Sequence, residues 1–342
     1  MKRIGIFGGG QLGKMIAIAA HSLGFRAFVF AETDDCPAVN VVKDYIIAPF
    51  TDKSALLHFA ESVDVITFES ENVPSYTLNL FHEKFKNQNI RAIEISQNRL
   101  LEKDFLKQNQ IPTTPYWPIA QIGDLEDLEF PIILKTTRGG YDGRGQFLLK
   151  NREEYESKVP SLEFPLIAEK LVDIKKEFSI IVARNETGKI HFPIAENVHS
   201  NGILRTSKVP AKLSPTLSDE VVKIGLQISD LLNIKGLICI EFFLDHMDRL
   251  MVNELAPRPH NSGHWSMDCC DIDQFEELVL AITDNRLKQP NLILPCIMKN
   301  VLGEEISLWS DMIAEKNLRF YNYGKDEARP ERKMGHFNIL LS

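Results

Sequence analysis

Short apolar runs alternate with amphipathic segments over the first hundred residues. The runs are typical of strands and lie at residues 2–7, 26–30, 45–48 and 63–68. Apolar side chains at helical spacing predict helices at residues 11–23 and 53–61. This alternation favours a parallel sheet with helices on both faces, and therefore an α/β fold. A helix predicted at 98–108 and a proline-rich linker at 111–118 place the first domain boundary near residue 100.

The middle of the chain has a different pattern. Four further strands, joined by glycine-containing or charged turns, are predicted at residues 130–135, 146–149, 165–169 and 178–183. An amphipathic helix is expected at 218–232, capped by Ser218 and carrying Asp219 and Glu220 in its first turn. A second boundary falls near Pro290, and short strands and turns are expected after it.

Composition narrows the class of protein. With 342 residues, of which 44% are hydrophobic and 25% charged, the chain suits a globular protein of two or three domains. A net charge of −8 argues against non-specific binding to nucleic acid or to a membrane surface. No apolar run is long enough for a membrane span, so we expect a cytoplasmic protein. The five cysteines show no CxxC spacing and are expected to be buried thiols.

Residues 253–264, NELAPRPHNSGH, carry the strongest chemical signal. Short apolar runs at 237–240 and 250–252 are predicted strands, which puts Glu241 and Glu254 at strand exits. Two such carboxylates suit a Mg²⁺ ion that also binds phosphate oxygens. Donors for a small anion follow at Arg258, His260, Asn261, Ser262 and His264. The alternative is a surface loop with solvated glutamates.

Two glycine-rich segments are candidate phosphate sites. Residues 8–13, GGGQLG, fit the dinucleotide fingerprint G-x-G-x-x-G, and Glu32 lies 19 residues beyond Gly13. An NAD-dependent oxidoreductase therefore stays open. The segment 135–146 joins two predicted strands, so its glycine amides and Lys135 could bind a triphosphate. It lacks the helix and the Gly-Lys-Ser/Thr of a P-loop, and an ordinary hairpin is the alternative.

Together these segments resemble the ATP-grasp superfamily, and within it the N5-carboxyaminoimidazole ribonucleotide synthetase family of purine biosynthesis. The resemblance covers nearly the whole chain. It rests on GGGQLG at 8–13, FESENVP at 68–74, GGYDGRGQ at 139–146, HSNGILRTS at 199–207, NELAPRPHNSGHW at 253–265 and ARPERKMGH at 328–336.

The resemblance implies an ATP-grasp architecture of three domains. A Rossmann-like parallel-sheet domain would span residues 1–100, and an ATP-grasp domain 101–290 with a lid subdomain at about 115–172. A small β-rich domain would span 291–342. The family makes a carbamate from bicarbonate, ATP and the exocyclic amine of 5-aminoimidazole ribonucleotide. It would use Mg²⁺, pass through carboxyphosphate, and form a homodimer. A longer C-terminal tail than the one after GHFN is expected of the family.

The resemblance also implies a role for individual residues. The ATP contacts would be Arg99, Lys135, Gly140, Tyr141, Asp142, Gly143, Arg144, Gly145, Gln146, Glu169, Lys170, Leu171, Val172, Glu177, His199, Asn253 and Glu254. The Mg²⁺ ligands would be Glu241 and Glu254. The ribonucleotide contacts would be Gly10, Gln11, Leu12, Glu71, Tyr141, Asp142, Arg144, Lys325 and Arg332. The catalytic bicarbonate site would be Arg258, His260 and Asn261, with His260 as a candidate proton shuttle because its unperturbed pKa lies near neutrality.

Three rival functions stay open at this point. A formate-dependent ribonucleotide transformylase of the same superfamily also activates a one-carbon acid as an acyl phosphate. An NAD-dependent oxidoreductase is the rival from another class. The third is a nucleotide-binding protein without catalysis.

Overall fold

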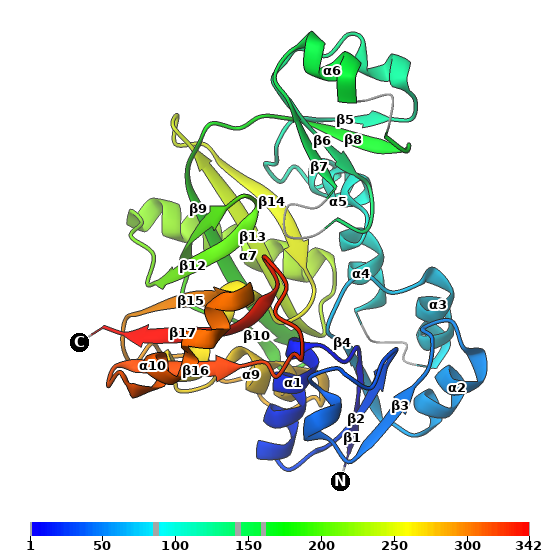
Figure 1. Ribbon diagram of the computed structural model, residues 1–342, viewed down its shortest axis with the longest axis vertical. Coiled ribbons are helices and arrows are strands. Elements are labelled where there is room, and N and C mark those ends of the chain that lie inside the picture. Colours follow the sequence, from blue (N-terminus) through cyan, green and yellow to red (C-terminus); the bar gives the residue numbers. More distant parts are fainter. Residues whose placement is uncertain (1, 85–88, 141–144, 159–161, 342) are drawn as a thin grey trace.

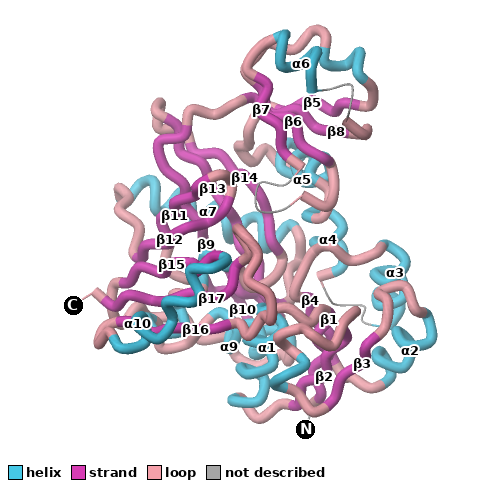
Figure 2. Tube along the Cα trace, viewed as in Figure 1, coloured by secondary structure: helices cyan, strands magenta, loops and turns pink. Residues whose placement is uncertain are grey.

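The structure is a computed structural model that describes residues 2–84, 89–140, 145–158 and 162–341. Within these residues the strands form three sheets. Figure 1 shows strands β5, β6, β7 and β8 at one end of the molecule and strands β9, β13 and β14 in its centre. The N-terminal strands lie beside the lower part of the centre. The tube view in Figure 2 shows long strands running through the central body, with helices at its sides.

The N-terminal sheet is parallel, with strand order β3-β2-β1-β4. Its elements are β1 (Arg3–Phe7), α1 (Gln11–Ser22), β2 (Arg26–Ala31), the 3₁₀ helix η1 (Val39–Val41), β3 (Asp44–Ile47), α2 (Lys53–Glu61) and β4 (Val65–Phe68). The predicted α/β alternation is confirmed here. Two helices that the pattern did not predict follow, namely α3 (Ser75–Lys84) and α4 (Ile90–Ser96), before α5 (Arg99–Gln108).

A separate antiparallel sheet, which we call the lid sheet, has the strand order β5-β8-β6-β7. Its elements are β5 (Tyr116–Ile119), η2 (Ile122–Leu125), β6 (Ile132–Thr136), β7 (Gln146–Leu149), α6 (Arg152–Lys158) and β8 (Leu166–Lys170). The prediction that residues 111–118 are only a linker is wrong for its last three residues. They begin β5, where Tyr116 pairs with Glu169.

The central sheet is built on two long strands, β9 (Ile174–Asn185) and β13 (Gly236–Asp245), and runs β14-β13-β9-β11-β12-β15-β17-β16. The other strands are β10 (Gly188–His191), β11 (Ala195–Ser200), β12 (Ile203–Val209), β14 (Leu250–Ala256), β15 (Cys296–Leu302), β16 (Leu318–Asn322) and β17 (Lys333–Leu340). The C-terminal strands extend this sheet through the pairing of β12 with β15. The domain boundaries near residues 100 and 290 stay predictions.

Helices cover the central sheet because its longest strands are apolar on both faces. Helix α7 (Pro215–Leu231) packs against β9, and α9 (Gln274–Ile282) packs against both β9 and β13. The remaining short helices are η4 (Asn261–Gly263), α8 (Ser266–Cys269), η5 (Gly303–Leu308) and α10 (Trp309–Ala314). Burial on both faces explains why residues 237–240 of β13 are all apolar rather than alternating with polar residues.

The predicted start of α7 is wrong by one turn. Its N-cap is Ser214, whose hydroxyl accepts a hydrogen bond from the Leu217 N–H at 3.3 Å. Pro215 occupies the first helical position, where no backbone N–H is needed. Asp219 and Glu220 therefore lie one turn further inside the helix than the sequence analysis placed them.

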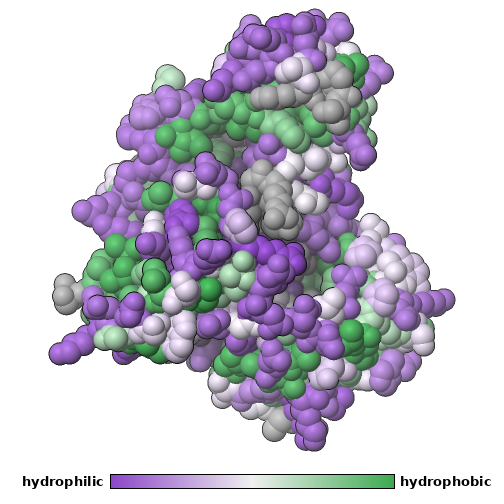
Figure 3. All heavy atoms as spheres, viewed as in Figure 1, coloured by the Kyte–Doolittle hydropathy of each residue, from purple (hydrophilic) through white to green (hydrophobic). Residues whose placement is uncertain are grey.

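The face of the molecule in Figure 3 is largely hydrophilic, with hydrophobic side chains gathered in smaller areas. None of the helices in the described residues is both long and apolar enough to cross a membrane.

The N-terminal core depends on a cluster of phenylalanine rings around Phe59 of α2. Its ring centroid lies 5.4 Å from that of Phe30 and 5.5 Å from that of Phe28. We expect Phe59→Ala to lower the free energy of unfolding by about 3–5 kcal/mol, because it leaves a cavity among packed rings. Urea denaturation measures the loss. Leu57→Ala, on the exposed side of the same helix, should change it by less than about 0.5 kcal/mol.

Candidate active site

A cavity of about 900 Å³ lies where the three sheets meet. Its walls come from the N-terminal glycine loop, the lid sheet, strands β13 and β14, and the segment before β17. Most of the predicted site residues that the structure describes line this one cavity: Gly10, Gln11, Leu12, Glu71, Arg99, Lys135, Gly140, Gln146, Glu169, Lys170, Leu171, Val172, Glu177, His199, Glu241, Asn253, Glu254, Arg258, His260, Asn261, Lys325 and Arg332. Gly145 does not line it, and residues 141–144 lie outside the described residues.

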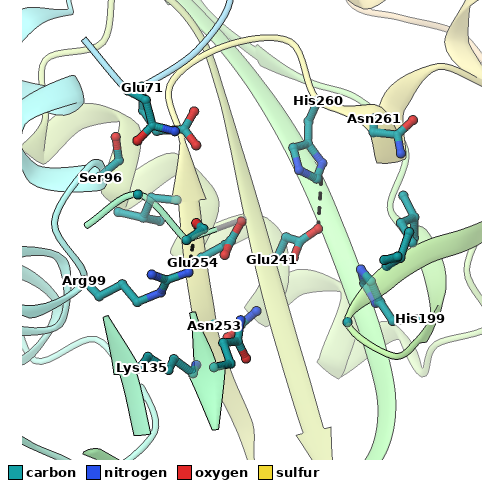
Figure 4. A pocket seen from close by; sticks show the side chains of 18 of the residues that line it. Glu71, Ser96, Arg99, Lys135, His199, Glu241, Asn253, Glu254, His260 and Asn261 are labelled. Atoms are coloured by element: carbon teal, nitrogen blue, oxygen red, sulfur yellow. Dashed lines mark hydrogen bonds and ion pairs between the residues drawn. The ribbon is translucent and has the colours of Figure 1, made fainter. Parts of the chain in front are cut away.

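Two carboxylates face each other on the cavity floor. Glu241 of β13 and Glu254 of β14 are partners in the antiparallel register, at a point where the register shifts after Glu241. The prediction that both sit at strand exits is wrong, since both strands continue past them. Burial, with the charge of Glu254 beside it, raises the pKa of Glu241 to about 7. Figure 4 shows both side chains at the centre of the cavity.

This pair suits a divalent cation. Two carboxylates brought together at low exposure are mutually repelled, and a hard cation between them removes the repulsion. Among the described residues no group of three or more His, Cys, Asp and Glu side chains is arranged to hold a metal ion. The remaining oxygen ligands of such an ion would therefore have to come from a substrate, from water or from other groups, which is how Mg²⁺ is commonly bound.

His260 enters the cavity as a neutral ring. Its Nδ1 atom accepts a hydrogen bond from the Ser262 N–H at 3.3 Å and lies 2.9 Å from the Ser262 hydroxyl. An accepting Nδ1 leaves the ring proton on Nε2. Burial and the nearby Arg258 hold the pKa of His260 well below its usual range. The ordinary pKa of a histidine therefore does not apply to His260, and this environment favours a ring that donates a hydrogen bond. The role of His260 as a proton shuttle stays a prediction.

Sequence reasoning missed the support beneath His260. The side chain of Gln274 accepts from the His260 N–H and donates to the His260 carbonyl, both at 2.9 Å. The Ser262 hydroxyl lies 2.8 Å from that of Ser179, which accepts from the Asn197 side chain at 3.0 Å. These partners come from other elements, so no local motif reveals them.

Arg258 is held by a carboxylate from the N-terminal part of the chain. Its guanidinium donates to both oxygens of Glu71, at 2.5 and 3.1 Å. The Arg258 charge outweighs burial and holds the pKa of Glu71 below its usual range. Nearby, the buried side chain of Asn261 has no hydrogen-bond partner for either its oxygen or its nitrogen. A buried amide without partners is costly, which makes Asn261 a candidate ligand contact.

Lys135 and Glu169 form an ion pair across the lid strands β6 and β8, at 2.8 Å. The other oxygen of Glu169 accepts from the Thr114 hydroxyl at 2.7 Å and lies 3.6 Å from Lys103 Nζ. Although burial opposes ionisation, Lys103 and Lys135 lower the pKa of Glu169 to about 2. Lys103 was not among the predicted residues, because it reads as an ordinary lysine of an amphipathic helix.

Arg99 joins the lid sheet to helix α5. Its guanidinium donates to the carbonyl oxygens of Thr136 and Gly140, at 2.9 and 3.0 Å. Across the cavity, His199 Nδ1 lies 2.7 Å from a Glu177 oxygen. Burial by itself would lower the pKa of His199. The bond to Glu177 and the charge of the nearby Glu241 outweigh burial, so the pKa lies above its usual value. Figure 4 shows Arg99 and His199 on opposite sides of the glutamates.

The N-terminal glycine loop is filled by a side chain of the protein itself. The Gly10 and Gly13 N–H groups donate to the two carboxylate oxygens of Glu69, at 2.6 and 2.8 Å. These are the amides at the start of α1 that a dinucleotide phosphate would use. Glu69 was missed, although it follows strand β4 directly. Glu32 does not line the cavity.

The C-terminal cations reach the same cavity as this loop. Lys325 Nζ donates to the Lys333 carbonyl at 2.7 Å, and Arg332 donates to the Glu327 carbonyl at 2.8 Å. Lys14 of α1 donates to the carbonyls of Asn322 and Tyr323, which ties the N-terminal helix to this segment.

Comparison with known proteins agrees with this arrangement. The model of the ATP-grasp domain matches residues 104–275, that of the ribonucleotide synthetase preATP-grasp domain matches 1–97, and that of the phosphoribosylaminoimidazole carboxylase C-terminal domain matches 296–342. The N5-carboxyaminoimidazole ribonucleotide synthase of Staphylococcus aureus is 38% identical over 99% of this chain and 92% of its own.

Two solved structures show the same fold. The S. aureus N5-carboxyaminoimidazole synthetase complexed with ADP is 37% identical, with a TM-score of 0.94 over 100% of this chain and 93% of that one. The enzyme of Aspergillus clavatus in complex with ADP and 5-aminoimidazole ribonucleotide is 26% identical, with a TM-score of 0.91 over 99% and 94%.

Fold and site together define an ATP-grasp ligase, so the predicted fold class is confirmed. The match extends over the whole chain and over all three parts of the architecture. The chain belongs to the N5-carboxyaminoimidazole ribonucleotide synthase family. This membership favours the carboxylating enzyme over the transformylase, the NAD-dependent oxidoreductase and a protein without catalysis.

The raised pKa of Glu241 predicts a pH dependence of stability. The folded state binds the Glu241 proton more tightly than the unfolded chain does. Its contribution to the free energy of unfolding is therefore complete below the ordinary value of 4.5 and is lost as pH rises to about 7. Urea denaturation of the ligand-free protein across this range should show the decline. Because burial also raises the pKa values of Glu102 and Glu277, Glu241→Gln should make the decline shallower without removing it. An equal decline in the variant would assign the whole effect to the other groups.

Proposed function

We propose that this protein uses ATP and Mg²⁺ to carboxylate the exocyclic amine of 5-aminoimidazole ribonucleotide with bicarbonate. The products are N5-carboxyaminoimidazole ribonucleotide, ADP and phosphate. The observation that carries the proposal is the single cavity in which the lid lysine Lys135, the floor pair Glu241 and Glu254, and the C-terminal cations Lys325 and Arg332 all lie. The relatives that carry the name of this enzyme match over more than nine tenths of their own length.

Bicarbonate is a poor electrophile, so the reaction needs activation by phosphoryl transfer. Positioning and charge neutralisation dominate the catalysis of such a step. Glu241 and Glu254 would hold Mg²⁺, which supplies neutralisation of the phosphate charge when it is bound. Lys135 and Arg99 would orient the nucleotide phosphates from the lid side. Main-chain groups of residues 169–172 and the carboxylate of Glu177 would hold the adenine and ribose.

The one-carbon site would lie at the loop after β14. Arg258, fixed by Glu71, presents a permanent positive charge to the carbonate oxygens. His260 would donate from Nε2, and Asn261 would use the donor and acceptor that have no partner in the protein. Carboxyphosphate hydrolyses readily, so these residues must act in a cavity from which water is excluded.

The ribonucleotide would lie between the N-terminal glycine loop and the C-terminal segment. Gly10, Gln11 and Leu12 line the cavity on one side, and Lys325 and Arg332 on the other. Its 5′-phosphate would pair with the two cations, and Glu71 would face the sugar or the base. Tyr141, Asp142 and Arg144 are further proposed contacts, from the segment outside the described residues.

The decisive experiment measures ADP release in the presence of each possible acceptor and one-carbon acid. Release that requires both bicarbonate and 5-aminoimidazole ribonucleotide, together with trapped labelled carbamate, supports the proposal. Release that requires formate would assign the transformylase activity instead. Binding of NAD(H) without ATP turnover would contradict both.

Glu254→Gln should abolish ATP turnover without unfolding the protein, because it removes one of the two anionic ligands proposed for Mg²⁺. A second measurement does not depend on activity. Mg²⁺ with ADP should raise the melting temperature of the wild type and should have a much smaller effect on the variant. If the variant turned over ATP at the wild-type rate in saturating Mg²⁺, Glu254 would not be a ligand of the metal. Glu304→Gln, at an exposed position outside the cavity, is the control.

Arg332→Ala should raise the KM for the ribonucleotide far more than that for ATP. The substitution removes a charge-assisted contact to a phosphate, which contributes on the order of 1.5–3 kcal/mol to the binding free energy. Initial rates at varied concentrations of each substrate measure the two constants. Arg319→Ala, exposed on strand β16, should change neither. Equal increases in both constants would place the ribonucleotide phosphate elsewhere.

The proposal extends to location and assembly. We place the enzyme in the cytoplasm, where purine biosynthesis would supply its substrate, and we propose a homodimer. The apolar side chains of Leu308, Trp309 and Ile313, which are exposed on η5 and α10, are candidates for the contact between two copies. Light scattering at micromolar concentration tests the dimer, and a monomer at every concentration would contradict it.

A further inference from the structure

We propose that Lys103 is a positioning residue of the ATP site. It stays paired with Glu169 when ATP binds and thereby leaves Lys135 available to the nucleotide phosphates. This inference rests on the proposed function, because it requires Lys135 to contact ATP. It concerns a lysine on the helix below the lid, outside every motif in the sequence analysis.

The position of Lys103 is fixed from the body of the protein. Its side chain is almost fully buried, and Nζ donates to the Thr113 hydroxyl and to the Asn253 carbonyl, both at 2.9 Å. Asn253 belongs to β14, the strand that carries Glu254 on the cavity floor. A buried ammonium with two neutral acceptors still requires a carboxylate nearby, and Glu169, at 3.6 Å, forms an ion pair with it. Glu169 also acts on Lys103 more strongly than Glu102 and Glu254 do.

Glu169 belongs to the lid sheet and has two cations within reach. Lys135 lies 2.8 Å from one of its oxygens, while Thr114 and Lys103 approach the other. One buried carboxylate therefore stands between two ammonium groups, and the three side chains carry one net positive charge. Figure 4 shows Lys135 pointing from the lid strands towards Asn253 at the edge of the cavity.

This charge balance decides what Lys135 can do. If Glu169 had Lys135 as its only cation, transfer of Lys135 to a phosphate would leave a buried carboxylate unpaired, at a cost of several kcal/mol. Because Lys103 stays with Glu169, Lys135 can exchange the carboxylate for phosphate without leaving a bare charge behind. The pair between Lys103 and Glu169 also connects the body to the lid sheet at the point where the nucleotide would bind between them.

The experiment compares the Kd for ATP, measured by calorimetry, across a set of charge variants. Lys103→Gln keeps an amide that can donate to Thr113 and Asn253 but removes the charge, and it should weaken ATP binding about tenfold or more. Lys103→Gln/Glu169→Gln removes the competing carboxylate as well, so its Kd should return to within about threefold of the wild type. A role of Lys103 in packing alone predicts no such recovery.

Two controls separate the possible failures. Lys235→Gln removes another mostly buried lysine that pairs with a carboxylate, Asp284, and it should leave the Kd for ATP unchanged. Lys135→Gln should weaken ATP binding. If it does not, Lys135 makes no contact with ATP and that part of the proposed function is wrong.

Other outcomes overturn the inference alone. If Lys135→Gln weakens binding but Lys103→Gln does not, Lys103 has no influence on Lys135. If the double variant binds ATP as weakly as Lys103→Gln, the competition with Glu169 is wrong. If Lys103→Gln does not fold, the double variant decides: near wild-type affinity supports the inference, and affinity as low as that of Lys135→Gln overturns it. The KM for the ribonucleotide should stay unchanged throughout.

Discussion

The pairing of buried charges is the constraint on which the rest of this structure depends. Arg258 pairs with Glu71, His199 with Glu177, and both Lys135 and Lys103 with Glu169. The pairs of Arg258 with Glu71 and of Lys103 with Glu169 join different parts of the chain, so these charges meet only once the parts are packed together. At the centre of the cavity, by contrast, two carboxylates are neighbours, because Glu241 and Glu254 are partners in the sheet register. A site organised in this way attracts a cation and holds the surrounding cations ready for anionic substrates.

Two parts of the fold, the floor strands β13 and β14 and the lid sheet, contribute charged side chains to the cavity. The floor carries the two glutamates on long strands that helices cover, so their separation is set by sheet register rather than by a loop. The lid sheet has its own small core around Leu134 and Leu149, and it contributes Lys135 and Glu169. Hydrogen bonds from Arg99 connect helix α5 to the Thr136 and Gly140 carbonyls of the lid.

Local sequence patterns predicted those features that depend on local physics. Hydrophobic periodicity located the N-terminal strands and α2, and motifs collected most of the residues that line the cavity. The N-cap of α7 was misplaced because Ser214 and Ser218 are both acceptable caps, and only the position of Pro215 decides between them. Lys103, Glu69, Ser179 and Asn197 could not be found in this way. Their partners lie on other elements, and burial rather than neighbouring sequence gives them their roles.

The carboxylate of Glu69 gives the N-terminal glycine loop a meaning beyond this enzyme. A β-carbon added at Gly8 or Gly10 would collide with Glu69, and one at Gly13 with the Gly8 carbonyl. All three glycines would thus be retained even if no nucleotide ever touched the loop. The glycine motif indicates that an anion lies close to the start of a helix. The carboxylate of an internal side chain can be that anion just as a cofactor phosphate can. A search by fingerprint alone scores the two cases alike, and Glu69, the residue that follows strand β4, distinguishes them.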